Sequence, residues 1–285
     1  MQVRLRPGTS DDAEACGRIV YEAFKSICDQ HNFPLEIPSV EAATGLVTMS
    51  LANPGMYSVV AELDGRIVGS NFLDERSVIA GIGVVTVDPS VMNVTIGRQL
   101  MQDVLDRAAQ RNFPGVRLVQ IAWHYRSLAL YTKLGFDTRE TLSVMQGPPL
   151  DLKIDGYEVR PAREADVPAC NQLCRRVHGH DRGGHLLDAI PQGAANVVER
   201  QGKLTGYCTG IGFFHHAVAE TNDDLAALIG AATTFDGPGF LLPSRNGELF
   251  RWCLSRGLRI AEQATLMTIG LYNEPAGAYL PSISY

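Results

Sequence analysis

The chain has 285 residues, of which 45% are hydrophobic and 20% are charged, and its formal net charge is −6. This composition excludes a mostly disordered chain, and no apolar run reaches the ~18–20 residues that span a bilayer. No basic run indicates nucleic-acid binding, and the first residues lack the apolar core of a signal peptide, so we expect a cytoplasmic protein.

The first predicted element is a strand at residues 3–7, followed by a turn and a helix capped by Thr9 or Ser10. Apolar residues recur at helical spacing along this helix: Cys16, Ile19, Val20, Ala23 and Phe24. A second helix precedes a hairpin at residues 62–69, which has a Gly-containing turn. Strands at 82–87, 116–122 and 141–145 then alternate with helices. This order predicts an α+β fold with a mixed sheet.

Three patterns occur twice, in the same order. Arg6, Pro7, Asp12, Ala15 and Cys16 recur as Arg160, Pro161, Asp166, Ala169 and Cys170. The pattern E-x-x-G-(R/K)-(I/L)-x-G occurs at 62–69 and at 199–206, and Leu134-Gly135-Phe136 is echoed by Arg256-Gly257-Leu258. We interpret the chain as two copies of one fold, residues 1–146 and 157–285, joined by a Pro/Gly-rich linker at 147–156.

The strand at 82–87 ends at Asp88-Pro89, and a loop then leads into a helix that begins near Ile96. Free backbone N–H groups and the positive end of the helix dipole face outward at such a helix N-terminus. The segment is therefore a candidate phosphate site.

The next helix ends in Tyr131-Thr132-Lys133-Leu134-Gly135-Phe136. Together with Val87-Asp88-Pro89 and with Gly97 at the matching distance, this segment resembles the GNAT acyltransferase superfamily. The whole chain resembles its two-domain bacterial type, two tandem GNAT-like domains with a degenerate second copy. The resemblance implies acyl transfer from acetyl-CoA, or another acyl-CoA, to an amine, without a metal.

The resemblance also implies positions for the co-substrate. Its pantetheine would pair with the strand around Val85 and Val87, where a bulge separates two strands. Its pyrophosphate would lie on the backbone of Met92, Asn93, Val94, Thr95, Ile96 and Gly97, next to Arg98. Thr95 stands where the family has Gly, and its Cβ narrows the phosphate site. Met92 offers no polar side chain that could bind phosphate.

The resemblance assigns the general acid to Tyr131, and the alternative is a core aromatic residue. The family's strand Glu is missing, because Val84 and Val85 stand there, so the candidate bases are Asp74, Glu75 and His124, which titrates near neutrality. A solvated strand end is the alternative for the two acids. His31 and Phe33 are expected to line the acceptor pocket or to pack the loop against the core.

The second copy has Ala219-Glu220-Thr221-Asn222-Asp223-Asp224 at the position of the phosphate loop, and acids there repel pyrophosphate. It has Cys253 at the position of Tyr131. We expect this copy not to bind CoA, but to stabilise the first copy or to close its acceptor cleft with the tail at 272–285.

Metal binding is not expected. The six cysteines form no C-x-x-C pair and are interpreted as buried thiols. His178, His180, Asp181 and His185, and the pair His215-His216, lack metal-site spacing; we interpret them as hydrogen-bonded loop residues, with acceptor binding across the domain interface as the alternative.

The leading hypothesis is an N-acyltransferase active in the first copy. A non-catalytic acyl-CoA-binding or regulatory protein is the rival, and loss of CoA binding is a third possibility. The expected partner is a small-molecule or protein amine, with no nucleic acid and no membrane, and the chain is expected to be a monomer or homodimer.

Overall fold

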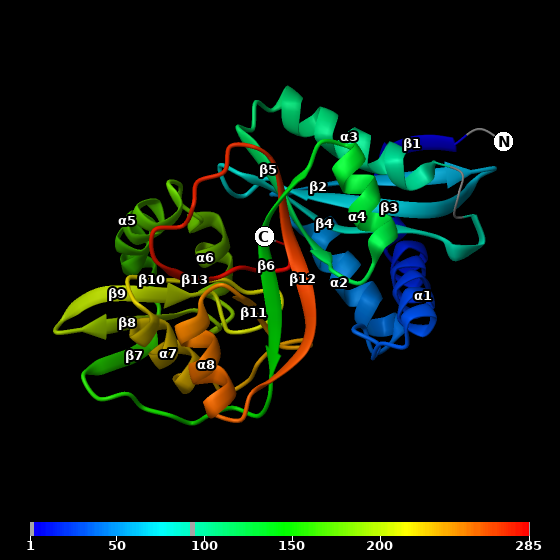
Figure 1. The fold of residues 1–285 in the computed structure, drawn as a ribbon. Coiled ribbons are helices and arrows are strands. Elements are labelled where there is room, and N and C mark those ends of the chain that lie inside the picture. Colours follow the sequence, from blue (N-terminus) through cyan, green and yellow to red (C-terminus); the bar gives the residue numbers. More distant parts are fainter. Residues whose placement is uncertain (1–2, 92–94, 285) are drawn as a thin grey trace.

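The computed structural model describes residues 3–91 and 95–284. The first half contains helices and strands that contribute to the cleft described below (Figure 1). They are β1 (Val3–Pro7), α1 (Ala13–His31), α2 (Val40–Ala52), β2 (Met56–Leu63), β3 (Arg66–Asp74), β4 (Ala80–Val87), α3 (Ile96–Gln110), β5 (Gly115–Ile121), α4 (Tyr125–Lys133) and β6 (Asp137–Gln146).

The second half repeats this order and adds a final strand. They are β7 (Tyr157–Pro161), α5 (Val167–His178), α6 (Gly183–Ala189), β8 (Asn196–Arg200), β9 (Lys203–Cys208), β10 (Ala217–Ala219), α7 (Asn222–Ala231), β11 (Phe240–Pro243), α8 (Gly247–Ser255), β12 (Arg259–Gly270) and β13 (Ala278–Leu280). Short 3-10 turns lie at Ser10–Asp12, Pro89–Val91 and Glu164–Asp166.

The first repeated pattern encodes one ion-pair arrangement in both halves. Arg6 donates to both carboxylate oxygens of Asp12, at 2.7 and 2.8 Å, and to Glu62 at 2.7 Å. Arg160 donates in the same way to Asp166, at 2.8 and 2.9 Å, and to Glu199. In each half, one arginine therefore links the turn before the first helix to a hairpin, β2–β3 in the first half and β8–β9 in the second.

The second repeated pattern encodes one hairpin. The β2–β3 turn places Asp64 and Gly65 at positive φ, and the β8–β9 turn does the same with residues 201 and 202. The register shifts just before Glu62 in the first hairpin and just before Glu199 in the second. The repeat predicted from the sequence is thus confirmed down to the turn and the bulge.

The two halves share a sheet through exchanged strands. The larger sheet has the order β1-β2-β3-β4-β5-β12-β6-β11, so β12 of the second half lies between β5 and β6 of the first. In return, β6 lies between β11 and β12 of the second half. The two long strands run antiparallel at the centre of the molecule (Figure 1). The sheet is therefore continuous across the boundary at 147–156, and the division into domains there stays a prediction.

The five-stranded sheet of the second half has the order β13-β10-β9-β8-β7. All six cysteines are buried free thiols, as expected. In the part of the chain that the structure describes, no helix is long and apolar enough to cross a membrane.

Candidate active site

The site begins with an irregularity in β4. Val84 adopts a φ of 41°, and the register between β3 and β4 shifts between Ser70 and Phe72. On its other edge β4 pairs with β5 in parallel from Ala80 to Ile82. Beyond Ile82 the pairing with β5 ends within the described residues, so one edge of β4 opens there. The predicted bulge with separated strands is present.

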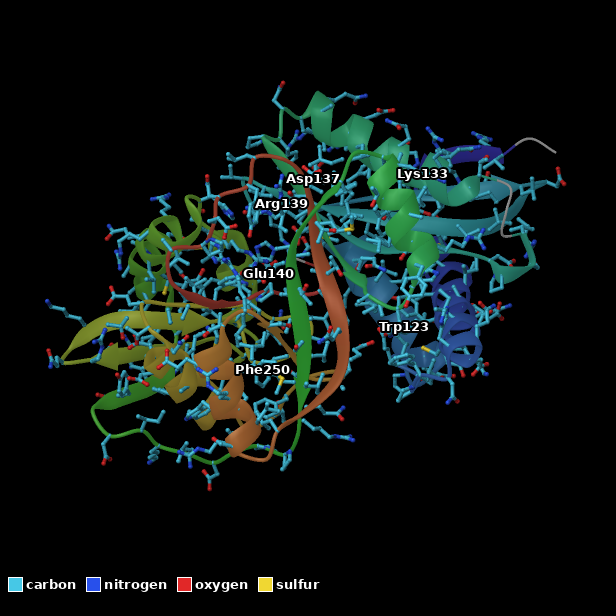
Figure 2. All side chains as sticks on the ribbon, in the orientation of Figure 1. Trp123, Lys133, Asp137, Arg139, Glu140 and Phe250 are labelled. Carbon is cyan, nitrogen blue, oxygen red and sulfur yellow. The ribbon has the colours of Figure 1, made fainter. Side chains whose placement is uncertain are left out.

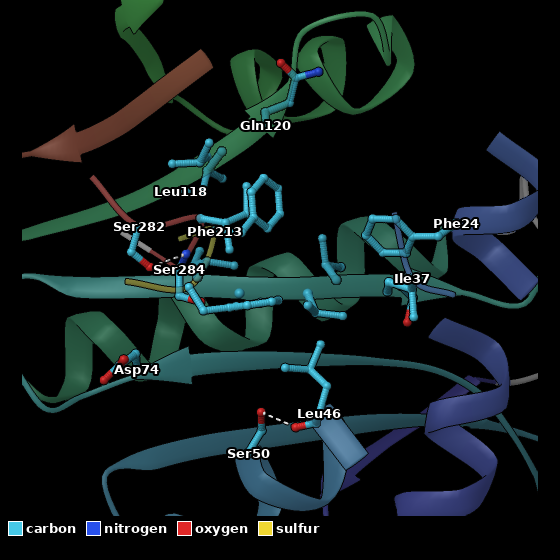
Figure 3. Close-up of a pocket in the computed structure, with 18 of the residues that line it drawn as sticks. Phe24, Ile37, Leu46, Ser50, Asp74, Leu118, Gln120, Phe213, Ser282 and Ser284 are labelled. Carbon is cyan, nitrogen blue, oxygen red and sulfur yellow. Dashed lines mark hydrogen bonds between the residues drawn. The ribbon is translucent and has the colours of Figure 1, made fainter. Parts of the chain in front are cut away.

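A cavity of about 1620 Å³ opens at this separation, and both halves line it. Figure 3 shows Phe24 and Ile37 at one end and Asp74 at the other, with Leu118 and Phe213 between them. The tail contributes the side chains 282–284. The tail thus lines the same cavity as the first half, and its role in closing an acceptor cleft stays a prediction.

The N-terminus of α3 faces the same cavity. Thr95, Ile96, Gly97 and Arg98 line it, together with Val85 and Val87 of β4. Thr95 precedes the helix with a φ of 60°, a left-handed conformation that a β-branched residue adopts only at a cost. Gln99 Nε2 donates to Thr95 Oγ1 at 3.2 Å. The predicted pyrophosphate residues Met92, Asn93 and Val94 lie outside the described residues.

Tyr131 on α4 is only 8% exposed, and its ring packs edge-on against that of Phe136, with the ring centroids 6.1 Å apart. It also lines the cavity, so it belongs to both the core and the cleft. Burial raises the pKa of its phenol well above the usual value. The hydroxyl therefore keeps its proton at neutral pH and can donate it.

His124 is the N-cap residue of α4 and lines the cavity. Burial, helped by the nearby His31 and Arg126, lowers its pKa to about 4. The expectation that this imidazole titrates near neutrality is therefore wrong. At pH 7 the ring is neutral, and it can relay a proton only as a weak base.

The two predicted strand-end acids are both engaged by cations. Glu75 accepts two hydrogen bonds from Arg107, at 2.7 and 3.0 Å, and it lies away from the cavity. Asp74 lines the cavity but accepts from Arg76 and from His185 Nε2, the latter at 3.0 Å. Burial alone would raise the pKa of Asp74, but these hydrogen bonds outweigh burial and hold the pKa well below its usual value. The structure thus gives Glu75 a structural ion pair and not a place beside the reacting atoms.

The loop after α1 packs on Trp123, which lies beside α1 (Figure 2). Phe33 stacks on the indole at 4.6 Å, and His31 contacts it at 5.0 Å. Neither lines the cavity, so the structure favours the packing role over the acceptor-binding role. Glu36, in the same loop, does line it and was missed. Its sequence signal is a single acid between Leu35 and Ile37.

A second missed acid lies behind Trp123. The indole Nε1 donates to Glu262 Oε2 at 3.3 Å, and Glu262 belongs to the exchanged strand β12. Burial and the negative charge of Glu262 raise the pKa of Glu36 to about 8. Each half thus contributes one carboxyl group to this region.

In the second half, as far as the structure describes it, the equivalent strand edge is paired. Its strand β10, which corresponds to β4, pairs with β9 on one side and with β13 on the other. At the N-terminus of α7, Thr221 accepts from the backbone of Asp224, and the Asp224 carboxylate accepts from the Thr221 backbone. The chain's own segments therefore occupy both features that would hold a CoA.

Comparisons agree with this architecture. Residues 20–136 match the model of the acetyltransferase (GNAT) family. A mycothiol acetyltransferase from Thermomonospora curvata is 37% identical over 92 residues, which are 32% of this chain and 31% of that protein. The chain thus spans about a third of the length of this curated relative.

Two solved structures have the same fold over nearly the whole chain. A putative acetyltransferase from Pyrococcus horikoshii has a TM-score of 0.76 at 18% identity, covering 97% of this chain and 92% of that one. A tandem GNAT protein from the clavulanic acid biosynthesis pathway has a TM-score of 0.59 at 14% identity, covering 94% and 98%. Residues 20–136 in the first half thus match a GNAT acetyltransferase domain, and the chain as a whole shares its fold with a tandem GNAT protein.

Proposed function

We propose that the first half transfers an acetyl group, or another acyl group, from acyl-CoA to an amine. The observation that carries this proposal is the open edge of β4, which meets the α3 N-terminus and Tyr131 in one cavity. The family match and the similarity to a mycothiol acetyltransferase support acetyl-CoA as the donor.

In this proposal, each wall of the cavity holds one part of the donor. The pyrophosphate would accept from the first backbone N–H groups of α3, with Arg98 beside it. The pantetheine would lie along Val85 and Val87 of the open strand edge. This arrangement brings the thioester to the part of the cavity that Tyr131 lines.

In the reaction, the amine nitrogen attacks the thioester carbonyl, so that a C–N bond forms and the C–S bond breaks. The leaving thiolate takes a proton from the Tyr131 hydroxyl, which its raised pKa keeps protonated until then. Before the attack the ammonium loses one proton to a carboxylate or, through water, to solvent. The second proton, which the nitrogen loses as the amide forms, returns through water to the Tyr131 phenolate. The products are an amide and free CoA.

A rival function is a non-catalytic acyl-CoA-binding protein, in which the altered loop still holds the ligand. Thr95, whose Cβ narrows the proposed phosphate site, favours a third possibility, the loss of CoA binding. The test is titration of the full chain with acetyl-CoA, followed by measurement of free thiol with a panel of amines. Binding with thiol release supports the enzyme, and binding without release by any amine supports the rival. No binding means that the phosphate site is closed and contradicts both.

The second half is proposed to complete the acceptor cleft, since His185, Phe213 and residues 282–284 line the cavity. The acceptor is a small-molecule amine or a protein amine. The cytoplasmic location and the state as monomer or homodimer stay predictions.

A further inference from the structure

Charged side chains line three parts of the cavity wall, and one of these parts is the ion-paired group of Asp74, Arg76 and Asp188. Three cationic residues line the side built by α3 and α4: Arg98, Arg126 and Lys133. Glu36 lines the side built by the loop between α1 and α2. An anionic donor and a cationic acceptor would therefore be attracted to different parts of one cavity.

Glu36 lacks a counter-charge in the described structure. Its Oε1 atom is buried and has no hydrogen-bond partner among residues 3–91 and 95–284. A buried carboxyl oxygen without a donor is unfavourable, and a ligand that supplies an N–H group would relieve it. Because Glu36 lines the cavity, such a ligand can reach it from there.

Among the described residues, the charge that acts on Glu36 comes from an acid, Glu262 on β12. His124, which follows β5 and lines the same cavity, is neutral at pH 7. Burial keeps the Cys28 thiol on α1 protonated, and its pKa rises to about 11. Trp123, which also lines the cavity, donates its only N–H to Glu262. A cation at Glu36 would relieve both the desolvation and the repulsion between the two acids.

The wall next to Glu36 is apolar. It is built by side chains of α1, α2 and their connecting loop: Phe24, Ile27, Ile37, Leu46 and Met49. Figure 3 shows Phe24, Ile37 and Leu46 around the cavity. An acceptor held here by an ammonium group would place an aliphatic or aromatic body against this wall.

We propose that Glu36, backed by the negative charge of Glu262, binds the ammonium group of the acceptor, and that the acceptor is an amine with an apolar body. This inference rests on the proposed acyl transfer but names the acceptor class. The site is built from both halves, since Glu262 arrives only with the exchanged strand β12.

The binding test uses the full chain and calorimetric titration with hexylamine, 1-hexanol and methylamine. We expect hexylamine to bind at least tenfold more tightly than either control, because hexanol lacks the charge and methylamine lacks the apolar body. Equal binding of hexanol would overturn the ammonium site, and equal binding of methylamine would overturn the apolar acceptor class.

The proton balance gives a second readout. At pH 7 Glu36 mostly holds its proton, because its pKa is about 8. A bound ammonium ion favours the carboxylate, so this proton leaves to solvent and the affinity rises as the pH rises through 8. Titrations in buffers of different ionisation enthalpy should show release of nearly one proton per hexylammonium bound. Absence of proton release would contradict the role of Glu36.

Variants assign the effect to this residue. Glu36→Gln should lower hexylamine affinity at least tenfold and abolish proton release, while Glu36→Asp should keep part of both. Glu41→Gln is the matched control, because Glu41 is an exposed acid on the neighbouring helix. Unchanged affinity in Glu36→Gln would overturn the proposal, and the hexanol comparison on the unmodified chain decides it if the variant fails to fold.

The same samples separate this inference from the proposed function. One outcome is that the chain binds acetyl-CoA and releases thiol with other amines but shows no preference for hexylamine. This outcome would support acyl transfer and contradict the Glu36 site. Glu36-dependent hexylamine binding without acetyl-CoA binding would support the Glu36 site and contradict acyl transfer.

Discussion

Tyr131 and Cys253 occupy the same position in the two halves. The Tyr131 carbonyl accepts a hydrogen bond from Phe136 N at 3.0 Å, and the Cys253 carbonyl accepts one from Leu258 N at 3.2 Å. In each case the intervening glycine, Gly135 or Gly257, has a positive φ that ends the helix. The second half thus keeps the backbone conformation at the end of α4 without the phenol of Tyr131.

Replacing Tyr131 with Phe should lower kcat by about 10²-fold or more, in the range that general acids contribute, with acetyl-CoA affinity unchanged. Steady-state thiol release and calorimetry measure the two quantities. Tyr125→Phe is the control, because Tyr125 lies on the same helix but is 70% exposed. A Tyr131→Phe variant with full turnover would contradict the assignment.

Acetyl-CoA should bind once per chain. The edge of β10 is already paired with β13, and the N-terminus of α7 is already capped by Thr221 and Asp224. Calorimetric titration gives the stoichiometry directly. Two sites per chain would show that β13 or the cap can be displaced and that the second half is not degenerate.

Thr95→Gly should tighten acetyl-CoA binding. Glycine adopts the observed φ of 60° without steric cost and removes the Cβ from the phosphate position. Thr95→Ala is the comparison, because it keeps the Cβ and removes only the hydroxyl. If both variants bind alike, the Cβ is not the obstacle. The dissociation constants of the three proteins decide this.

Arg6→Ala should lower the free energy of unfolding at pH 7 by about 2 kcal/mol, because Arg6 makes charged hydrogen bonds to Asp12 and Glu62. Hydrogen bonds from Arg6 hold the pKa of Asp12 at about 2, below its unfolded value near 3.9. This stabilisation is present above pH 4 and is lost as the pH falls through 2.

Urea unfolding at several pH values measures this effect. Arg160→Ala is the matched variant in the second half, and it should behave alike because Arg160 holds Asp166 and Glu199 in the same geometry. If Arg6→Ala unfolds with the pH dependence of the unmodified chain between pH 4 and pH 2, the Arg6–Asp12 pair does not stabilise the fold.

The sequence by itself determined the local features. The repeated Arg6 and Arg160 patterns, the two hairpin turns and the glycines after α4 and α8 were all readable, because each depends on residues close in the chain or on backbone conformations that few residues adopt. The family motifs likewise located Tyr131 and the start of α3, because each motif is a continuous stretch of sequence.

Only the tertiary structure decided which strands meet and which side chains are buried. The alternation of side chains along a strand does not show which strand will pair with it. The exchange of β6 and β12, and with it the approach of Glu262 to Glu36, could therefore not be predicted from the sequence. The ion pair of Glu75 with Arg107 and the low pKa of His124 are likewise products of packing. Burial and charge from distant segments set these properties, and the local sequence carries neither.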